Sequence, residues 1–451
     1  MSRGRINLNN VTYNGVANPP ITPAESLDAA MAGLGVPHPV VYRTGGHLLE
    51  DLGSRYWAAI NEYAARGLLQ RFVDVTIPED CPQDLMNVAT DILDNPENAG
   101  SWYKMYRIPK KKEEGHRRRG GPPGFREIEA PDPALKQLQR ALLFNWWYAR
   151  NRPQICVQGF VPGRGTLTNA TKHVADNVFG KNKTLLKDDI RDFFRSITRS
   201  SVMNALLEER GHAVFSGKAV KFPRVFRGMA EGDPLKAFGI EPDLFETCLQ
   251  KGVDLKNMDN RDKVRPLLLA CVMMDHVALR LCCIDERLPQ GSPCSPALAN
   301  IFMKTFNGLL QYRLGQLLGN TDNFTSTIYA DDIVTTLGPG VDDEAASMVR
   351  RIITSQMLSY PDISPNYKKM GVFRHGHPQR VTGITITDKL SISRQERDKV
   401  RAELHNAATG VKKLTGEDKL RLKGVRAWMR GVDAEGWDSR CEKLFKEVIG
   451  L

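Results

Sequence analysis

Two short segments of the sequence each place aspartates at the end of an apolar run. The first reads LLKDDI at residues 185–190, and the second reads IYADDIV at residues 328–334. Such runs predict buried strands, and the second predicts a β-hairpin with both of its acids at the turn. Burying carboxylates without a cation is costly, and Mg²⁺ prefers carboxylate and phosphate oxygens. The pattern indicates phosphoryl transfer by two Mg²⁺ ions about 3.5–4 Å apart; the alternative is an acidic turn and a helix N-cap.

The strongest concentration of positive charge lies between Lys104 and Arg126, where nine residues are basic and two are acidic. The flanking segments MYRIPK and FREIEAP predict strands, and GGPPG predicts a turn, so we expect a hairpin with a cationic tip. A solvated loop is the alternative. The whole chain has a net charge of +11 and a pI of about 9.2. This balance suits a polyanionic partner such as nucleic acid without proving one.

Length and composition limit the classes of protein to which this chain can belong. A chain of 451 residues, 41% of them hydrophobic, with a mean hydropathy of −0.36, is expected to fold as several packed lobes. These values argue against disorder, and the absence of any apolar run of about 18 residues argues against a membrane protein. The N-terminus lacks an apolar signal core, and the eight cysteines form no C-x-x-C pair. We therefore expect reduced thiols and a cytoplasmic location.

Periodicity predicts several helices around the two acidic segments. Near the N-terminus we expect helices over residues 22–35, 56–67 and 85–93. Residues 267–281 predict a strongly apolar helix, while residues 213–262 are polar and irregular and indicate an insertion. The final segment predicts helices with these side chains inward: Leu404, Val411, Leu420, Val425, Trp428 and Leu444.

The order of the motifs resembles that of reverse transcriptases, and most of all the bacterial retron type, from about residue 104 to the C-terminus. Residues 329–332 (YADD) resemble the polymerase C motif, residues 189–194 (DIRDFF) the A motif and residues 288–296 (LPQGSPCSP) the B motif. Asn169-Ala170-x-x-His173 and Val381-Thr382-Gly383 resemble signatures of retron enzymes in particular. Five motifs in the family's order are not expected by chance.

This resemblance implies an α+β right-hand polymerase fold. It would comprise a small helical N-terminal region (1–100), fingers (101–186), a palm with an antiparallel sheet and helices (187–384), and a helical thumb (385–451). The insertion near residues 213–262 would belong to the palm. The interval between the A and B motifs is longer than compact family members need, and the first hundred residues match nothing in the family. The subtype, a retron enzyme or a related defence-associated reverse transcriptase, therefore stays open.

The resemblance assigns the binding of two Mg²⁺ ions to Asp189 and Asp331, helped by the Ile190 carbonyl and with Asp332 alongside. Asp188 is the rival for the position of Asp189. The family spacing to the paired phenylalanines favours Asp189, and Asp188 is then expected to be solvated.

Three further roles near the chemistry follow from the resemblance. Asn366-x-x-Lys369 resembles the D motif, in which Lys369 would protonate the leaving pyrophosphate, although Lys368 fits the sequence equally well. Asp192 is expected to cap a helix. Phe194 stands where the family places an aromatic side chain that collides with a ribose 2′-OH and so selects deoxynucleotides. Plain core packing is the alternative for Phe194.

The incoming triphosphate would be gripped by Lys110 or Lys111 together with Arg126. Arginine suits a multidentate phosphate contact, and lysine acts as a point charge. Gln290 and Gly291 would lie under the nascent base pair and the template, where glycine permits close approach.

The resemblance also implies RNA-binding residues. These are Asn169 and His173 in the retron signature and Arg394, Arg397 and Arg401 in the thumb. Residues 385–451 contain fifteen basic and eleven acidic residues, which suits phosphate contacts. The alternatives are internal packing for Asn169 and His173, and a solvated helical face for the three arginines.

The function implied by the resemblance is RNA-directed DNA synthesis. The enzyme would bind a structured non-coding RNA, use part of it as template and primer, and add dNTPs to make a DNA product. Phage defence with a separate effector protein would be the setting, with no membrane partner. One alternative is a protein-primed or template-independent DNA polymerase of abortive-infection type. Another is a catalytically idle RNA-binding scaffold that restrains a toxin, although a scaffold has no need of three clustered acids.

Overall fold

A computed structural model of the protein describes residues 62–77, 82–109, 124–148, 153–174, 183–215, 270–319, 323–374, 376–433 and 439–450. The helix expected at 22–35, the hairpin tip with Lys110 and Lys111, and most of the insertion at 213–262 lie outside these residues. The described helices and strands make an α+β protein, as expected. None of these helices has the length and apolar character to span a membrane. The described residues form two compact units.

The first unit contains the described residues of 1–154, 191–313 and 356–364. Its N-terminal part packs α3 (Glu62–Thr76), α4 (Pro82–Asp94), η2 (Pro96–Trp102), α5 (Pro133–Leu142) and the π-helical turn η3 (Leu143–Trp147). Trp146 is fully buried here, and its Nε1 donates a hydrogen bond to Asp275 Oδ1 at 2.7 Å. The helix expected at 85–93 is confirmed as α4.

The helix expected to end at Gly67 instead continues to Thr76 as α3. Beyond the glycine, α3 buries Leu68, Leu69, Phe72 and Val73 completely. Burial of these four side chains stabilises the helical conformation by more than the roughly 1 kcal/mol that a glycine costs inside a helix.

The basic segment forms the expected hairpin in the first unit. β1 (Tyr103–Pro109) pairs antiparallel with β2 (Phe125–Pro131), with Arg107 opposite Glu127 and Ile108 opposite Arg126. The unit also contains α7 (Phe193–Ser196), α8 (Arg199–Phe215) and most of α13 (Ser295–Leu318). Residues 270–280 are helical, which agrees with the apolar helix expected there.

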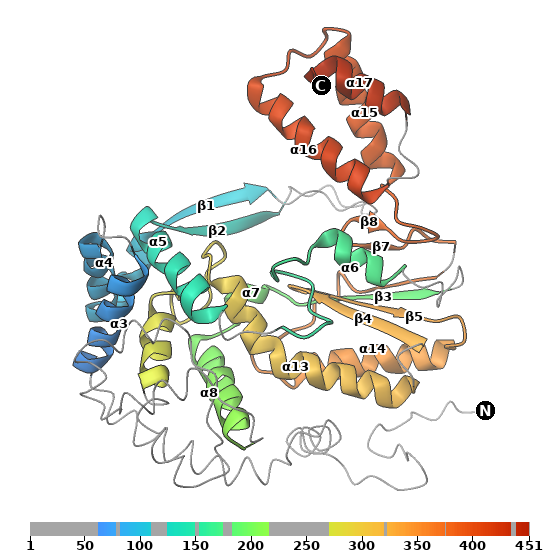
Figure 1. Ribbon diagram of the computed structural model, residues 1–451. Helices are drawn as coiled ribbons and strands as arrows, with labels where there is room; N and C mark the ends of the chain where they lie inside the picture. The colour runs from blue at the N-terminus through green and yellow to red at the C-terminus, as the bar shows by residue number, and fades with distance from the viewer. Residues whose placement is uncertain are drawn as a thin grey trace, which may run out of the picture. The chain divides into compact units, whose positions relative to one another are not determined.

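The second unit contains the described residues of 155–190, 314–355 and 365–451. Its centre is a four-stranded antiparallel sheet in the order β4-β5-β3-β6, formed by β4 (Phe324–Tyr329), β5 (Asp332–Leu337), β3 (Thr184–Asp189) and β6 (Gly371–Phe373). β3 and the β4–β5 hairpin confirm the two strand predictions. In Figure 1, α6 (Thr166–Lys172) lies on one side of this sheet and α14 (Asp343–Leu358) on the other.

The C-terminal helices α15 (Arg394–Ala408), α16 (Gly416–Val432) and α17 (Ser439–Ile449) pack together, next to the short strands β7 (Arg380–Val381) and β8 (Ile384–Thr385) (Figure 1). Both α15 and α16 begin at capping residues: Ser393 Oγ accepts from the Glu396 N–H at 3.2 Å, and Thr415 forms a capping box with Asp418. One hydrophobic cluster joins strand residues to all three helices: Val381, Ile384, Leu404, Leu422 and Phe445.

The side chains expected to point inward from these helices divide into two groups. Leu404 is buried, and Val425 and Leu444 are half-buried against the cluster. The prediction is wrong for Val411, Leu420 and Trp428, which are 78%, 71% and 38% exposed. In α16 the buried face is set by Leu422, Met429 and Val432, and Leu420 and Trp428 fall outside it.

Candidate active site

The sheet of the second unit brings the two acidic segments together. Asp189 at the end of β3 is the register partner of Asp332 at the start of β5. The β4–β5 hairpin pairs Tyr329 with Asp332 and turns through Ala330 and Asp331, as expected for YADD. Beyond the strand, the Ile190 N–H donates to the Asp331 carbonyl at 2.9 Å. The aspartates of both motifs therefore meet at one end of the sheet.

The loop before α6 supports this hairpin turn. The Gln158 N–H donates to the Ile328 carbonyl at 2.7 Å, so the loop runs beside β4. A Cβ on Gly159 would lie 2.7 Å from the Ala330 nitrogen, which is too close for any side chain. Gly159 is therefore required for the loop to approach the turn that carries Asp331. The glycine-rich loop is visible in the sequence, but its partner is not.

Two side chains hold the carboxylate of Asp189. Asn366 Nδ2 donates to Asp189 Oδ1 at 2.7 Å, and Lys369 Nζ donates to Asp189 Oδ2 at 2.9 Å. The Asn366 N–H also donates to the Asp189 carbonyl at 2.8 Å. Lys368 and Lys369 are both exposed, and these contacts place Lys369 at the acidic cluster. Asn366 is a supporting residue whose role the D-motif resemblance did not specify.

The charges of neighbouring carboxylates act on Asp332 and on Lys369. Burial is the largest cause that raises the pKa of Asp332, followed by the charges of Asp331 and, more weakly, Asp189, and the pKa reaches about 6. Burial alone would lower the pKa of Lys369, but the hydrogen bond to Asp189 and the charges of the three aspartates outweigh it and raise that pKa. The site thus carries excess negative charge that Lys369 only partly offsets.

Asp188 has a different environment from Asp189, because neighbouring strand residues point to opposite faces. Its side chain is fully buried, with Arg350 Nε of α14 at 3.5 Å from Oδ1. Burial raises the pKa of Asp188 to about 6, and the charge of Arg350 opposes that rise. The expectation that Asp188 is solvated is therefore wrong.

The donor chemistry of the acidic cluster fits a divalent cation. Asp189, Asp331 and Asp332 supply carboxylate oxygens and Ile190 a carbonyl, which are the ligands that Mg²⁺ prefers. A cation would favour the charged form of Asp332, whose pKa is raised first by burial and then by the charges of Asp331 and Asp189. No three His, Cys, Asp or Glu side chains in the described part of the chain already have a metal-binding arrangement. The side chains of Asn366 and Lys369 each donate one hydrogen bond to Asp189, and its carboxylate has further lone pairs that could bind a cation.

The residues expected to contact the nucleotide lie in the first unit. Arg126 is exposed on β2, whereas Lys110 and Lys111 lie outside the described residues. Phe194 of α7 is half-buried, with its ring centroid 5.3 Å from that of Phe193. Asp192 occupies the expected cap position of α7 in a left-handed conformation (φ +46°), but its side chain makes no capping hydrogen bond.

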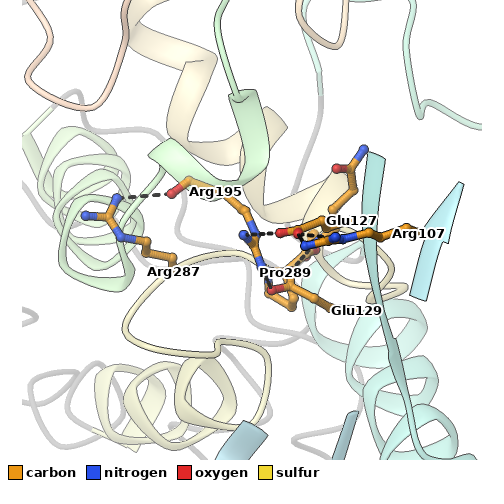
Figure 2. A network of polar contacts seen from close by, with 8 residues as sticks. Arg107, Glu127, Glu129, Arg195, Arg287 and Pro289 are labelled. Carbon is orange, nitrogen blue, oxygen red and sulfur yellow. Dashed lines mark hydrogen bonds and ion pairs between the residues drawn. The ribbon is translucent and has the colours of Figure 1, made fainter. Parts of the chain in front are cut away.

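The loop with Gln290 and Gly291 is fastened to β2. The Glu129 N–H donates to the Gln290 carbonyl at 2.9 Å, and the Gln290 N–H donates to Glu129 Oε2 at 2.8 Å. Gly291 has φ +150°, and a Cβ there would lie 2.4 Å from the Glu129 carbonyl oxygen. The close approach that requires glycine is therefore to strand β2. Glu129 also pairs with Arg195, as Figure 2 shows; neither residue was a candidate from the sequence.

The retron signature residues Asn169 and His173 are both completely buried. His173 Nδ1 lies 2.8 Å from Thr336 Oγ1, and Nε2 lies 2.7 Å from Thr327 Oγ1. Burial is the main cause that lowers the pKa of His173 to about 3, with smaller effects from nearby lysines, so the imidazole is neutral at pH 7. This placement favours the packing alternative over an RNA contact for both residues.

The three thumb arginines differ in their surroundings. The Arg394 side chain is 95% exposed, with Asp398 at 3.7 Å, and Arg401 is 4.0 Å from the same aspartate. Arg397 instead pairs with the buried Asp433 at 3.2 Å and lies 3.4 Å from the Ile392 carbonyl. Arg394 and Arg401 are therefore available on the surface of α15, while Arg397 links α15 to the end of α16.

No protein-family model matches the chain. The retron Mx65 reverse transcriptase of Myxococcus xanthus is 30% identical over 313 residues, which cover 69% of this chain and 59% of that protein. The retron Mx162 reverse transcriptase of the same organism is 28% identical, over 68% of this chain and 55% of that protein. The chain thus spans less than two thirds of these two relatives. The retron Ec73 reverse transcriptase of Escherichia coli is 23% identical over 80% of this chain and 91% of that protein.

Among solved structures, apo telomerase from Candida tropicalis, truncated from its C-terminal domain, is similar with a TM-score of 0.36 and 11% sequence identity. The match covers 64% of this chain and 55% of that chain, a level too low to establish a shared fold. At 23–30% identity over most of its length, this chain is similar to several retron reverse transcriptases.

Proposed function

We propose that this protein is an RNA-directed DNA polymerase that reverse transcribes a bound partner non-coding RNA. The single observation that carries the proposal is the register of β3 and β5, which opposes Asp189 to Asp332 beside Asp331. These are the acids of the A and C motifs, and the homology to retron reverse transcriptases supports the same activity. In this proposal the chain divides into fingers, palm and thumb at about residues 101, 187 and 385.

Asp189 and Asp331 would hold two Mg²⁺ ions with help from the Ile190 carbonyl and Asp332. Bound there, the metals would supply Lewis-acid activation of the attacking hydroxyl and stabilisation of the leaving group. Lys369 now offsets the charge of Asp189 at 2.9 Å. In this proposal the Lys369 ammonium group would be the acid that donates a proton to the departing pyrophosphate.

Nucleotide selection would depend on residues of the first unit. Arg126, exposed on the basic hairpin, would bind the triphosphate together with Lys110 or Lys111. Phe194 would exclude a ribose 2′-OH, and Gln290 and Gly291 would support the nascent base pair. The hydrogen bonds between the Gln290 loop and β2 support this role, because a loop held in a fixed position can exclude a mispaired base sterically.

The partner RNA would be contacted by exposed thumb residues. Arg394 and Arg401 suit phosphate contacts because they lie on the surface of α15. Arg397, Asn169 and His173 would act indirectly, by fixing the surfaces around them. We place this activity in the cytoplasm and in phage defence, together with a separate effector protein.

The proposal is tested by purifying the chain, sequencing the RNA that co-purifies, and sequencing the DNA made after addition of dNTPs and Mg²⁺. DNA complementary to the co-purified RNA is the expected result. DNA of random or homopolymeric sequence attached to a protein side chain would instead identify a template-independent, protein-primed polymerase. RNA without any DNA synthesis would identify an idle RNA-binding scaffold.

A further inference from the structure

We infer that Glu129, through its ion pair with Arg195, is a positioning residue for nucleotide selection. In this view the pair holds the Gln290–Gly291 loop and α7, which carries Phe194, in fixed positions against strand β2. The inference deepens the proposed function and rests on it. All of the residues concerned lie within the first unit.

Glu129 contacts the backbone of Gln290 both through its own backbone N–H and through its side-chain carboxylate. Its N–H donates to the Gln290 carbonyl at 2.9 Å, and its Oε2 accepts from the Gln290 N–H at 2.8 Å. Glu129 thus provides hydrogen-bond partners for both the N–H and the carbonyl of Gln290. The next residue, Gly291, is pressed against the Glu129 carbonyl, where any Cβ would clash. The loop cannot shift relative to β2 while these contacts persist.

The other carboxylate oxygen of Glu129 accepts from Arg195 Nη2. The side chain of Glu129 is 6% exposed and that of Arg195 is 43% exposed, so solvent screens this contact less than the contact between Arg195 and Glu127. Arg195 also donates from Nη1 to Glu127 Oε2 at 3.1 Å, but Glu127 is 41% exposed. The two glutamates therefore differ: both pair with Arg195, and Glu129 alone joins that arginine to the Gln290 loop through its carboxylate.

Arg195 directly follows Phe194, and its backbone is fixed as well. Arg287 Nη1 donates to the Arg195 carbonyl at 3.0 Å and lies 3.5 Å from the Ser196 carbonyl. In Figure 2, Arg195 extends from α7 toward Glu127 and Glu129, and Arg287 approaches it from the opposite side. α7 is therefore tied to β2 by a side chain and to Arg287 by its carbonyls.

The consequence is that one buried carboxylate connects three segments with proposed contacts to the nucleotide. These segments carry Arg126, three residues before Glu129 on β2, Phe194 on α7, and Gln290 in the loop. Misplacement of a reacting or selecting group by about 1 Å can cost about 10²-fold in rate. Loss of the Glu129 charge should therefore impair dNTP binding and sugar selection by more than its effect on the stability of the fold would explain.

The test compares Glu129→Gln with Glu127→Gln in the full chain, by single-nucleotide extension of a DNA primer on an RNA template. Both changes remove one charge next to Arg195, but only the first alters the contact to Gln290. For Glu129→Gln we expect the KM for dNTP to rise by roughly ten-fold and the preference for dNTP over rNTP to fall, with a smaller change in kcat. Glu127→Gln should stay within about two-fold of wild type, because the ion pairs of Glu127 with Arg195 and with Arg107 are both exposed.

Two further measurements test the role of Glu129 even if Glu129→Gln folds poorly. The double variant Glu129→Gln/Arg195→Gln leaves no unpaired charge, and it should fold while keeping the altered dNTP preference. Hydrogen exchange of the peptide containing residues 288–291 should be faster in Glu129→Gln than in Glu127→Gln, whether or not the chain makes DNA. Absence of extension by the wild-type chain contradicts the proposed function. Equal exchange and equal nucleotide preference in the two single variants overturn the positioning role of Glu129.

Discussion

Asp189 and Asp332 oppose each other directly across neighbouring antiparallel strands. A register slip of one residue would turn Asp189 to the face of the sheet that Asp188 occupies, beneath Arg350. The pairing of β3 with β5 is therefore what brings the A-motif acid to the turn that carries Asp331. The arrangement gathers negative charge around Asp332, and the charges of Lys187 and Lys369 oppose the resulting rise in the pKa of Asp332.

Replacing Lys369 with Met should reveal this excess charge. In metal-free buffer the variant should be less stable than wild type by about 1 kcal/mol, allowing for partial solvent screening. Mg²⁺ should raise its Tm more than that of wild type, because the metal and Lys369 compete for Asp189. Primer extension should slow by about 10²-fold if Lys369 donates a proton. Lys368→Met is the matched control, and identical behaviour of the two variants would remove Lys369 from the site.

Shortening Phe194 to Ala should weaken the exclusion of ribonucleotides. The ring is half-buried beside Phe193, so the variant should fold, and the ratio of rNTP to dNTP incorporation should rise by at least about ten-fold. Extension assays with each nucleotide measure this ratio. Unchanged sugar selectivity together with a lower Tm would show that Phe194 contributes to core packing and not to the choice of sugar.

Replacing Arg126 with Gln should weaken nucleotide binding without weakening RNA binding. Arg126 is exposed on β2, so stability should be unaffected, whereas loss of a charged phosphate contact should raise the KM for dNTP by roughly ten-fold or more. Lys104→Gln, on the same hairpin, serves as control. If RNA affinity and nucleotide KM deteriorate equally in Arg126→Gln, the residue is a general phosphate contact.

The buried His173 predicts a pH dependence of stability. Its pKa of about 3 in the folded chain lies below the unfolded value of about 6.5. As the pH falls below about 6.5, the unfolded chain binds a proton that the folded chain does not, so stability present above that pH is lost. Between pH 7 and pH 5 this loss should be about 2 kcal/mol. Urea unfolding of His173→Gln should show a smaller change over this interval, and an equal change would contradict the neutral, packed imidazole.

The strands and the meeting of the acids could be predicted from the sequence because local patterns encode them. Apolar runs that end in aspartate mark β3 and the β4–β5 hairpin, and the order of the motifs indicates which acids must converge. The burial of Asp188 could not be predicted in this way, since two adjacent aspartates give no sign of which face each one occupies.

The Glu129–Arg195 pair was missed for a different reason. A glutamate in a basic hairpin and an arginine after two phenylalanines each look like solvated charges, and nothing local relates them. Their contact depends on how β2, α7 and the Gln290 loop pack. The exposed side of α16 was mispredicted on similar grounds, because the face that packs against α15 and α17 is chosen by tertiary contacts rather than by the hydrophobicity of Leu420 or Trp428.

The most direct test of the proposed chemistry is primer extension on an RNA template by the double variant Asp331→Asn/Asp332→Asn, with RNA co-purification measured in parallel. The two changes remove carboxylate charge from the acidic cluster and leave the hairpin backbone in place. We expect DNA synthesis to be abolished while the partner RNA still co-purifies at the wild-type level. Extension at the wild-type rate would contradict the assignment of these aspartates to catalysis.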